Sequence, residues 1–205
     1  MRREVIYDEV FDAQEQFRLL LDSMARPGKI NIMPDMDIVP PAGLNKASAM
    51  IAFALLNTDV SFYAEGEGSD AIESYIALNT TAAPVNVGEA DFIFINGLYD
   101  AGIILDAKTG NLPYPEESAT FVIDVDAITE DAGDSELTLT LKGPGIETTK
   151  QVHIKGLNPG ILKAVREQNM EFPLGVDLIL TDKNNRILCI PRSNLFEVEY
   201  VGVEV

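Results

Sequence analysis

One segment limits the fold of this chain more than any other. Residues 47–56 read Ala-Ser-Ala-Met-Ile-Ala-Phe-Ala-Leu-Leu, so a helix formed by them is apolar on every face. Such a helix needs enclosure by neighbouring elements, because apolar surface is unfavourable in water. Residues 92–95, Phe-Ile-Phe-Ile, form an unbroken apolar run typical of a strand that is covered on both faces. The two segments predict a central helix packed on a sheet with layers on both sides.

Length and composition indicate one sizeable domain. The 205 residues fit a single domain, residues 1–205, because two domains in this length would each be small. The hydrophobic share of 46% supplies a core, and the charged share of 23% is too low for a disordered acidic tail.

The chain is strongly acidic and its charge is unevenly placed. It has 15 Lys and Arg against 33 Asp and Glu, a formal charge of -18, so nucleic acids and anionic membranes would repel it. Residues 47–141 contain one basic residue, Lys108, and 17 acidic ones, so this segment alone carries -16. Any anion-binding surface must come from the flanking segments. We interpret the acidic segment as solvated surface; the alternative is a docking face for a basic partner subunit.

Cysteine and histidine are too few for the common metal and disulfide frameworks. Cys189 and His153 are single residues of their type, which excludes an internal disulfide and a Cys/His zinc set, although a site of carboxylates alone stays open. We expect no metal site. The N-terminus lacks an apolar segment with a cleavage site, and the longest apolar run has about half of the roughly 20 residues of a membrane span. We therefore expect a cytoplasmic protein.

Helical signals are concentrated in the first 80 residues. Asp12 and Glu15 have capping-box spacing and predict a helix over residues 12–25, which ends before Pro27-Gly28. The residues at helical spacing are Ala13, Phe17, Leu20, Leu21 and Met24. Asn45 is the expected cap of the apolar helix. Further helices are expected over residues 69–79 and from Asn158-Pro159 to about residue 169.

Strand patterns dominate the rest of the chain. Residues 101–108 are ambiguous between helix and strand, and the acidic stretch 124–136 is interpreted as an exposed loop. Strands are expected over residues 60–64, 85–87, 92–95, 119–125, 137–141, 152–155, 176–181, 186–190 and 196–203. Strands buried on both faces, with helices before, between and after them, predict an α/β fold: a three-layer α/β/α sandwich around a mixed β-sheet.

No catalytic constellation is evident from the residues. His153 alternates with apolar neighbours and is interpreted as a polar strand position. The adjacent pair Glu116-Glu117 is interpreted as solvated. Asp177 begins an apolar strand, and Arg192 follows the strand expected to pair with it, so we predict a structural salt bridge between them.

Six motifs occur in a fixed order along the chain. They are Phe11-Asp-Ala-Gln-x-x-Phe-Arg18, Met24-Ala-Arg-Pro-Gly28, Pro115-Glu-Glu-Ser-Ala-Thr120, Leu141-Lys-Gly-Pro-Gly-Ile146, Phe172-Pro-Leu-Gly-Val-Asp-Leu178 and Cys189-Ile-Pro-Arg192. In this order, from about residue 10 to residue 200, the chain resembles the PhnH family of the bacterial carbon-phosphorus lyase system. Ser193-Asn194 departs from the Thr-Thr that often follows the Pro-Arg pair in that family.

The resemblance implies an accessory subunit of the core complex with PhnG, PhnI and PhnJ. That complex forms a ribose 1-phosphonate 5-triphosphate from ATP and an alkylphosphonate. The resemblance also implies a homodimer and a fold like the large domain of pyridoxal phosphate-dependent transferases, without the cofactor. It carries over no catalytic residue. The motif residues interpreted as structural are Pro27, Gly28, Gly143, Pro144, Gly145, Pro173, Gly175, Asp177 and Pro191.

Two alternatives stay open. The first is a nucleotide- or phosphonate-binding subunit with its own anion site or an interface built on Arg26, Lys29 and Arg192. The second is a pyridoxal phosphate-type enzyme, which would need a buried lysine, whereas most of the eight lysines lie at expected turns or strand ends.

Overall fold

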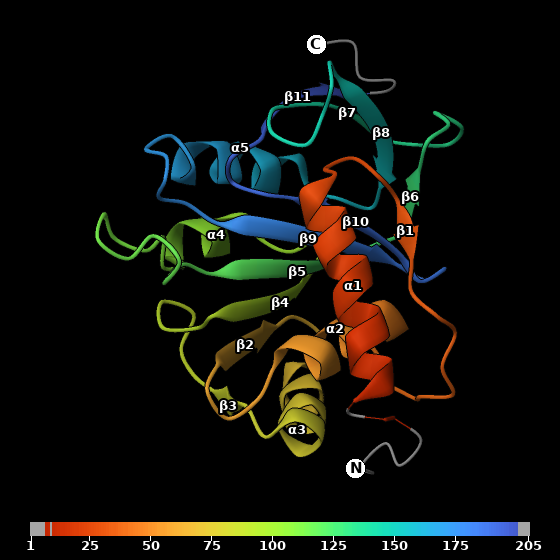
Figure 1. Ribbon diagram of the computed structural model, residues 1–205, viewed down its shortest axis with the longest axis vertical. Helices are drawn as coiled ribbons and strands as arrows, with labels where there is room; N and C mark the ends of the chain where they lie inside the picture. Colours follow the sequence, from red (N-terminus) through yellow and green to blue (C-terminus); the bar gives the residue numbers. More distant parts are fainter. Residues whose placement is uncertain (1–6, 9, 201–205) are drawn as a thin grey trace.

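The computed structural model describes residues 7, 8 and 10–200 (Figure 1). Its helices are α1 (Phe11–Ala25), α2 (Lys46–Leu55), α3 (Ser69–Thr80), α4 (Gly102–Asp106) and α5 (Pro159–Gln168). Its strands are β1 (Asn31–Ile32), β2 (Ser61–Glu65), β3 (Ala83–Pro84), β4 (Phe92–Asn96), β5 (Thr120–Val125), β6 (Ala127–Thr129), β7 (Leu137–Lys142), β8 (Lys150–Lys155), β9 (Asp177–Asp182), β10 (Arg186–Ile190) and β11 (Leu195–Tyr200).

The strands form two sheets. The large sheet has the order β1-β10-β9-β5-β4-β2-β3; its strands from β3 to β9 are parallel, and β10 and β1 add antiparallel. The small sheet has the order β11-β7-β8-β6 and is antiparallel throughout. The mixed α/β class with a mixed sheet is confirmed. The sequence did not predict that four strands form a sheet of their own.

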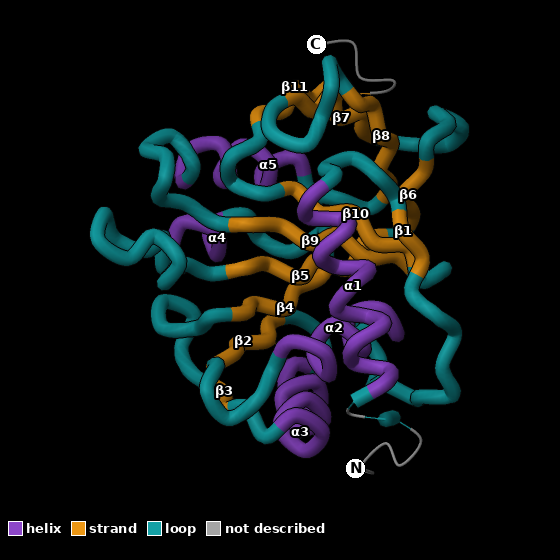
Figure 2. The backbone as a smooth tube through the Cα atoms, viewed as in Figure 1, coloured by secondary structure: helices purple, strands orange, loops and turns teal. Residues whose placement is uncertain are grey.

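Each face of the large sheet belongs to a separate core. Side chains alternate along β5, so that Val122 belongs to the core shared with α1, α2 and α3. Phe121 and Ile123 belong to the core shared with α4, α5 and the small sheet. Figure 2 shows α1 crossing in front of the large sheet, with the small sheet at the top of the view. Both predicted apolar segments are enclosed: Ala47–Phe53 of α2 is buried, and so are Ile93, Phe94 and Ile95 of β4. Their burial removes apolar surface from water on both faces of the sheet.

Several predicted elements agree with the structure. The helix expected from Asn158-Pro159 to about residue 169 is α5 (Pro159–Gln168), and the Asn158 side chain accepts a hydrogen bond from the Gly160 N–H, as expected of an N-cap. The hairpin of β9 and β10 is present with its antiparallel register. The ambiguous segment 101–108 contains the short helix α4. The predicted last strand is β11 as far as Tyr200, and residues 201–203 lie outside the described part of the chain.

Other predictions are wrong at the level of single elements. The N–H groups of Val10, just before α1, and of Phe11, its first residue, donate to the carboxylate of Asp8. Asp12 accepts from the Asp8 N–H. The carboxylate of Asp8 therefore accepts from the start of α1, and that of Asp12 does not. Of the apolar residues at helical spacing on the same helix, Leu20 is buried as expected, whereas Phe17 and Leu21 are exposed. The strand expected at residues 85–87 is instead β3, two residues earlier. Within the expected loop 124–136, Asp124 is buried at the end of β5 and residues 127–129 form β6.

The described residues contain no helix that is both long enough and apolar enough to cross a bilayer.

Candidate functional site

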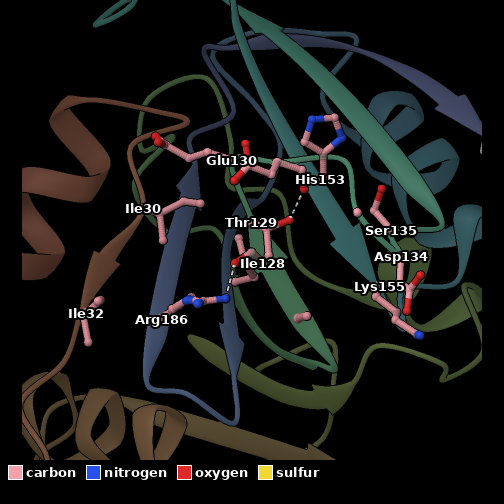
Figure 3. Close-up of a pocket in the computed structure, with 13 residues that line it drawn as sticks. Ile30, Ile32, Ile128, Thr129, Glu130, Asp134, Ser135, His153, Lys155 and Arg186 are labelled. Atoms are coloured by element: carbon pink, nitrogen blue, oxygen red, sulfur yellow. Dashed lines mark hydrogen bonds between the residues drawn. The ribbon is translucent and has the colours of Figure 1, made fainter.

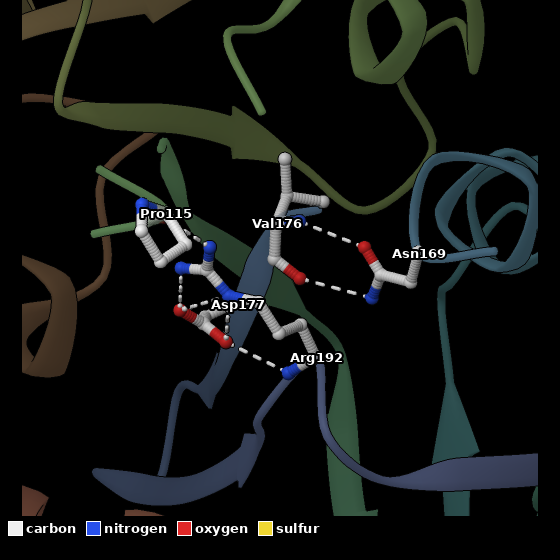
Figure 4. A network of polar contacts seen from close by, with 5 residues as sticks. All are labelled: Pro115, Asn169, Val176, Asp177 and Arg192. Carbon is white, nitrogen blue, oxygen red and sulfur yellow. Dashed lines mark hydrogen bonds and ion pairs between the residues drawn. The ribbon is translucent and has the colours of Figure 1, made fainter. Parts of the chain in front are cut away.

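The predicted salt bridge between Asp177 and Arg192 is confirmed (Figure 4). The Arg192 Nη2 atom lies 2.5 Å from Asp177 Oδ2, its Nε lies 3.2 Å from both carboxylate oxygens, and the Arg192 backbone N–H donates to Oδ1 at 2.7 Å. Because β9 and β10 are antiparallel, the start of one strand meets the end of the other. Only 15% of the Arg192 side chain and 20% of the Asp177 side chain are exposed. The pair is a partly buried, bidentate contact of the strong kind.

Arg192 also connects a distant motif to this pair. Its Nη1 donates to the carbonyl oxygen of Pro115 at 2.8 Å. Nearby, Asn169 at the end of α5 accepts from the Val176 N–H at 2.7 Å and donates to the Val176 carbonyl at 3.1 Å. Gly175 has a φ of +136° and packs against the Asn169 side chain, which leaves no room for a Cβ there. The motifs at residues 115–120, 172–178 and 189–192 therefore meet in one braced network.

The remaining glycine motifs meet at a second place. Gly145 has a φ of +84°, and a Cβ there would lie within 2.8 Å of Pro27 Cδ. The Asn194 side chain donates to the Pro144 carbonyl oxygen at 3.0 Å. Three turns thus pack on one another: the turn after α1, the turn between β7 and β8, and the turn after β10. Gly145, Pro27 and Pro144 take part in these contacts; the structural role of the other motif glycines and prolines stays a prediction.

The two other candidate anion ligands pair with one carboxylate. Arg26 Nη1 contacts Asp22 Oδ1, and Lys29 Nζ lies 2.6 Å from Asp22 Oδ2. Arg26 and Lys29 keep exposed fractions of 62% and 47% of their side chains. The structure thus brings Arg26 and Lys29 together on Asp22, whereas Arg192 binds a different carboxylate. An anion site on these three residues stays a prediction.

Asp124 is a buried carboxylate that the sequence reading missed. Its Oδ2 accepts from the Asn45 N–H at 2.7 Å, and its Oδ1 accepts from the hydroxyls of Ser48 and of Thr181, the latter at 2.7 Å. Burial raises the pKa of Asp124 to about 6, against the opposing effect of these hydrogen bonds. Asn45 starts α2 as expected, but its side chain bonds to Thr181 and not to the helix amides. Asp124 therefore fastens the N-terminus of α2 to β5 and β9.

The position of this contact matters for function. Asp124 and Thr181 lie near the carboxyl ends of parallel strands β5 and β9, where open α/β sheets bind their ligands. Here the N-terminus of α2 occupies that position. The cavity beside Asp124 has a volume of about 10 Å³, enough for one water molecule at most.

A larger pocket of about 540 Å³ lies between β1, β6, β10 and the loop after β6 (Figure 3). Ile30, Ile32 and Ile128 form its apolar part. Its charged and titratable lining comprises Glu130, Asp131, Asp134, His153, Lys155 and Arg186. Among the described residues Lys155 has no ion-pair partner, so it is the cation of this pocket that remains available to a ligand.

Two of the pocket residues have structural partners. His153 is buried in β8, and its Nδ1 lies 2.9 Å from the Thr138 hydroxyl on the paired strand, which agrees with the predicted polar strand position. Arg186 donates to the Ile128 carbonyl oxygen at 3.0 Å, and the buried Asp182 accepts from the Ile128 N–H at 3.1 Å. The side chains of Asp182 and Arg186 thus satisfy the open edge of β6. Across the described residues, no group of three or more His, Cys, Asp or Glu could hold a metal ion.

Fold and site together define a mixed α/β protein whose sequence motifs brace neighbouring turns. The family model described as "Bacterial phosphonate metabolism protein (PhnH)" matches residues 5–197. The chain therefore belongs to the PhnH family. It is 32% identical over 198 residues, 94% of each chain, to the Rhizobium meliloti (strain 1021) protein named "Alpha-D-ribose 1-methylphosphonate 5-triphosphate synthase subunit PhnH". It is also 29% identical to the Stutzerimonas stutzeri protein named "Putative C-P lyase subunit protein HtxG", over 88% of this chain and 83% of that protein.

Proposed function

We propose that this chain is an accessory, non-catalytic subunit of a carbon-phosphorus lyase core complex, in which it assembles with PhnG, PhnI and PhnJ. The complex would form ribose 1-phosphonate 5-triphosphate from ATP and an alkylphosphonate. One observation carries the proposal: α2 fills the position at the strand ends where an α/β enzyme would hold its substrate. The names of the two relatives, both subunits, support it.

The proposal includes finer features. We propose a homodimer, a cytoplasmic location, one domain over residues 1–205 and a fold like that of the large domain of pyridoxal phosphate-dependent transferases. The mixed sheet with helices on both faces supports the last of these. All eight lysines lie in the described part of the chain and none of them is buried, which gives the pyridoxal phosphate enzyme alternative no support.

A reconstituted complex tests whether the chain is non-catalytic. We expect His153→Gln and Lys155→Met to change turnover of ATP and methylphosphonate by less than about twofold, because neither residue takes part in the reaction. Loss of a general acid or base would lower turnover about a hundredfold or more. Omission of the chain should abolish assembly-dependent turnover. A hundredfold loss in either variant, with the complex still assembled, would contradict the non-catalytic role.

One residue of the pocket, Lys155, raises a second candidate, a nucleotide- or phosphonate-binding subunit, whereas the acidic lining of the pocket opposes it. Lys155 is available there, but Glu130, Asp131 and Asp134 surround the same space and would repel an anion. We therefore expect no measurable heat when the isolated chain is titrated calorimetrically with ATP or methylphosphonate at millimolar concentration. Heat that disappears in Lys155→Met would establish the second candidate in place of an accessory role alone.

A further inference from the structure

Five large apolar side chains are exposed near one end of the large sheet. Met170 and Leu112 are 79% and 75% exposed, and Phe172, Tyr114 and Leu105 are 65%, 55% and 48% exposed. We call these five residues the loop patch. Single exposed apolar residues are common, but a group of them on neighbouring segments marks an interaction site.

The loop patch comes from two segments that lie against each other. The Gly175 N–H donates to the Thr109 carbonyl oxygen at 3.1 Å, and the Gln168 side chain donates to the Ile104 carbonyl oxygen at 2.8 Å. In Figure 1 the loop after α4 and the loop after α5 project on the same side of the molecule, at the left of the view.

These segments are braced although their apolar side chains are exposed. Arg192 holds the Pro115 carbonyl, and Asn169 holds both backbone groups of Val176. Asn111 and Tyr114 exchange backbone hydrogen bonds of 3.2 and 3.0 Å. A surface ordered before it meets a partner loses less conformational entropy on binding. The motif network thus has a use beyond stability: it presents the loop patch in one conformation.

The charge around the loop patch identifies the kind of partner. Residues 105–117 and 170–174 carry one lysine, Lys108, which pairs with Asp91. The carboxylates in these two segments are Asp106, Glu116, Glu117 and Glu171. Two copies of the chain meeting here would bring these carboxylates together, which costs free energy. A surface with Lys and Arg around an apolar centre would complement them.

We propose that the loop patch docks a partner subunit through an apolar surface rimmed by Lys and Arg. This inference deepens the proposed function and rests on it. It also gives part of the acidic segment a role as a docking face.

The test compares matched double variants coexpressed with the other subunits of the proposed complex. We expect Leu112→Ser with Met170→Ser to weaken co-purification about tenfold or more, because central apolar anchors carry much of the binding energy of an interface. Glu116→Lys with Glu171→Lys should weaken it as well, and added salt should weaken binding of the wild type. The control is Val39→Ser with Leu195→Ser, two positions of similar exposure, 77% and 65%, outside the patch. Unchanged thermal unfolding of each variant verifies that it folds.

The outcomes separate the inference from the proposed function. If the wild type assembles and both patch variants assemble equally well, the docking surface is wrong and the accessory role stands. If the wild type does not assemble, both are overturned. If Leu112→Ser with Met170→Ser instead dissociates an isolated homodimer in light scattering, the patch contacts a second copy, and the assignment to a basic partner is overturned.

Discussion

Replacing Arg192 with alanine is expected to lower the free energy of unfolding by about 3 kcal/mol. The substitution removes the side-chain donors to Asp177 and the donor to the Pro115 carbonyl, and it leaves a carboxylate that is only 20% exposed without a cationic partner. Losing one member of a partly buried pair costs more than the pair contributes net, because the remaining charge stays desolvated. Urea unfolding followed by circular dichroism measures the change.

Two further variants make this prediction specific. Arg192→Lys keeps the charge but loses the bidentate geometry and should lose about half as much stability. Arg26→Ala breaks an ion pair whose arginine side chain is 62% exposed, and its effect should stay below about 0.5 kcal/mol. If Arg192→Ala were as mild as Arg26→Ala, the network in Figure 4 would not be the brace that we describe.

Asp124 should make the protein less stable as pH rises from about 4 to about 6. Burial raises the pKa of this carboxyl from its ordinary value of 3.8 to about 6 in the folded protein. Between these values the folded state holds a proton that the unfolded state has released, so deprotonation favours unfolding. A difference of about two units corresponds to about 3 kcal/mol, fully lost above pH 6.

The comparison with Asp124→Asn isolates this effect from the other carboxylates. Asparagine resembles the protonated carboxyl, so the variant should match the wild type near pH 4 and exceed its unfolding free energy by about 3 kcal/mol near pH 7.5. Asp131→Asn, at an exposed position, is the control and should follow the wild type. Parallel curves for Asp124→Asn and the wild type between pH 4 and 7.5 would show that the carboxyl is not destabilised by burial.

Sequence patterns predicted those elements whose local signal matches their final environment. The apolar run of α2, the two-sided burial of β4 and the Asn158 cap of α5 all follow from side chains within one segment. The predicted hairpin also placed Asp177 near Arg192, because in an antiparallel pair the start of one strand lies beside the end of the other.

The remaining features depend on contacts between distant segments. Asp124 is buried because the N-terminus of α2, distant in the sequence, closes over it. Because residues 124–136 are acidic, we expected an exposed loop there and did not predict the burial of Asp124 or the strand β6. The backbone groups at the open edge of β6 bond to the side chains of Asp182 and Arg186. The pocket beside β6 likewise combines residues of β1, β8 and β10, so the sequence pattern of one segment cannot predict it.

We propose that the chain acts by assembly with partner subunits. The most direct measurement coexpresses it with PhnG, PhnI and PhnJ homologues, purifies the sample through a tag on one partner and determines the mass and composition of the particle. We predict a single species that contains all four subunits in constant ratio through size-exclusion chromatography. A chain that elutes alone, while the other three subunits remain together, would contradict the proposed role as an accessory subunit.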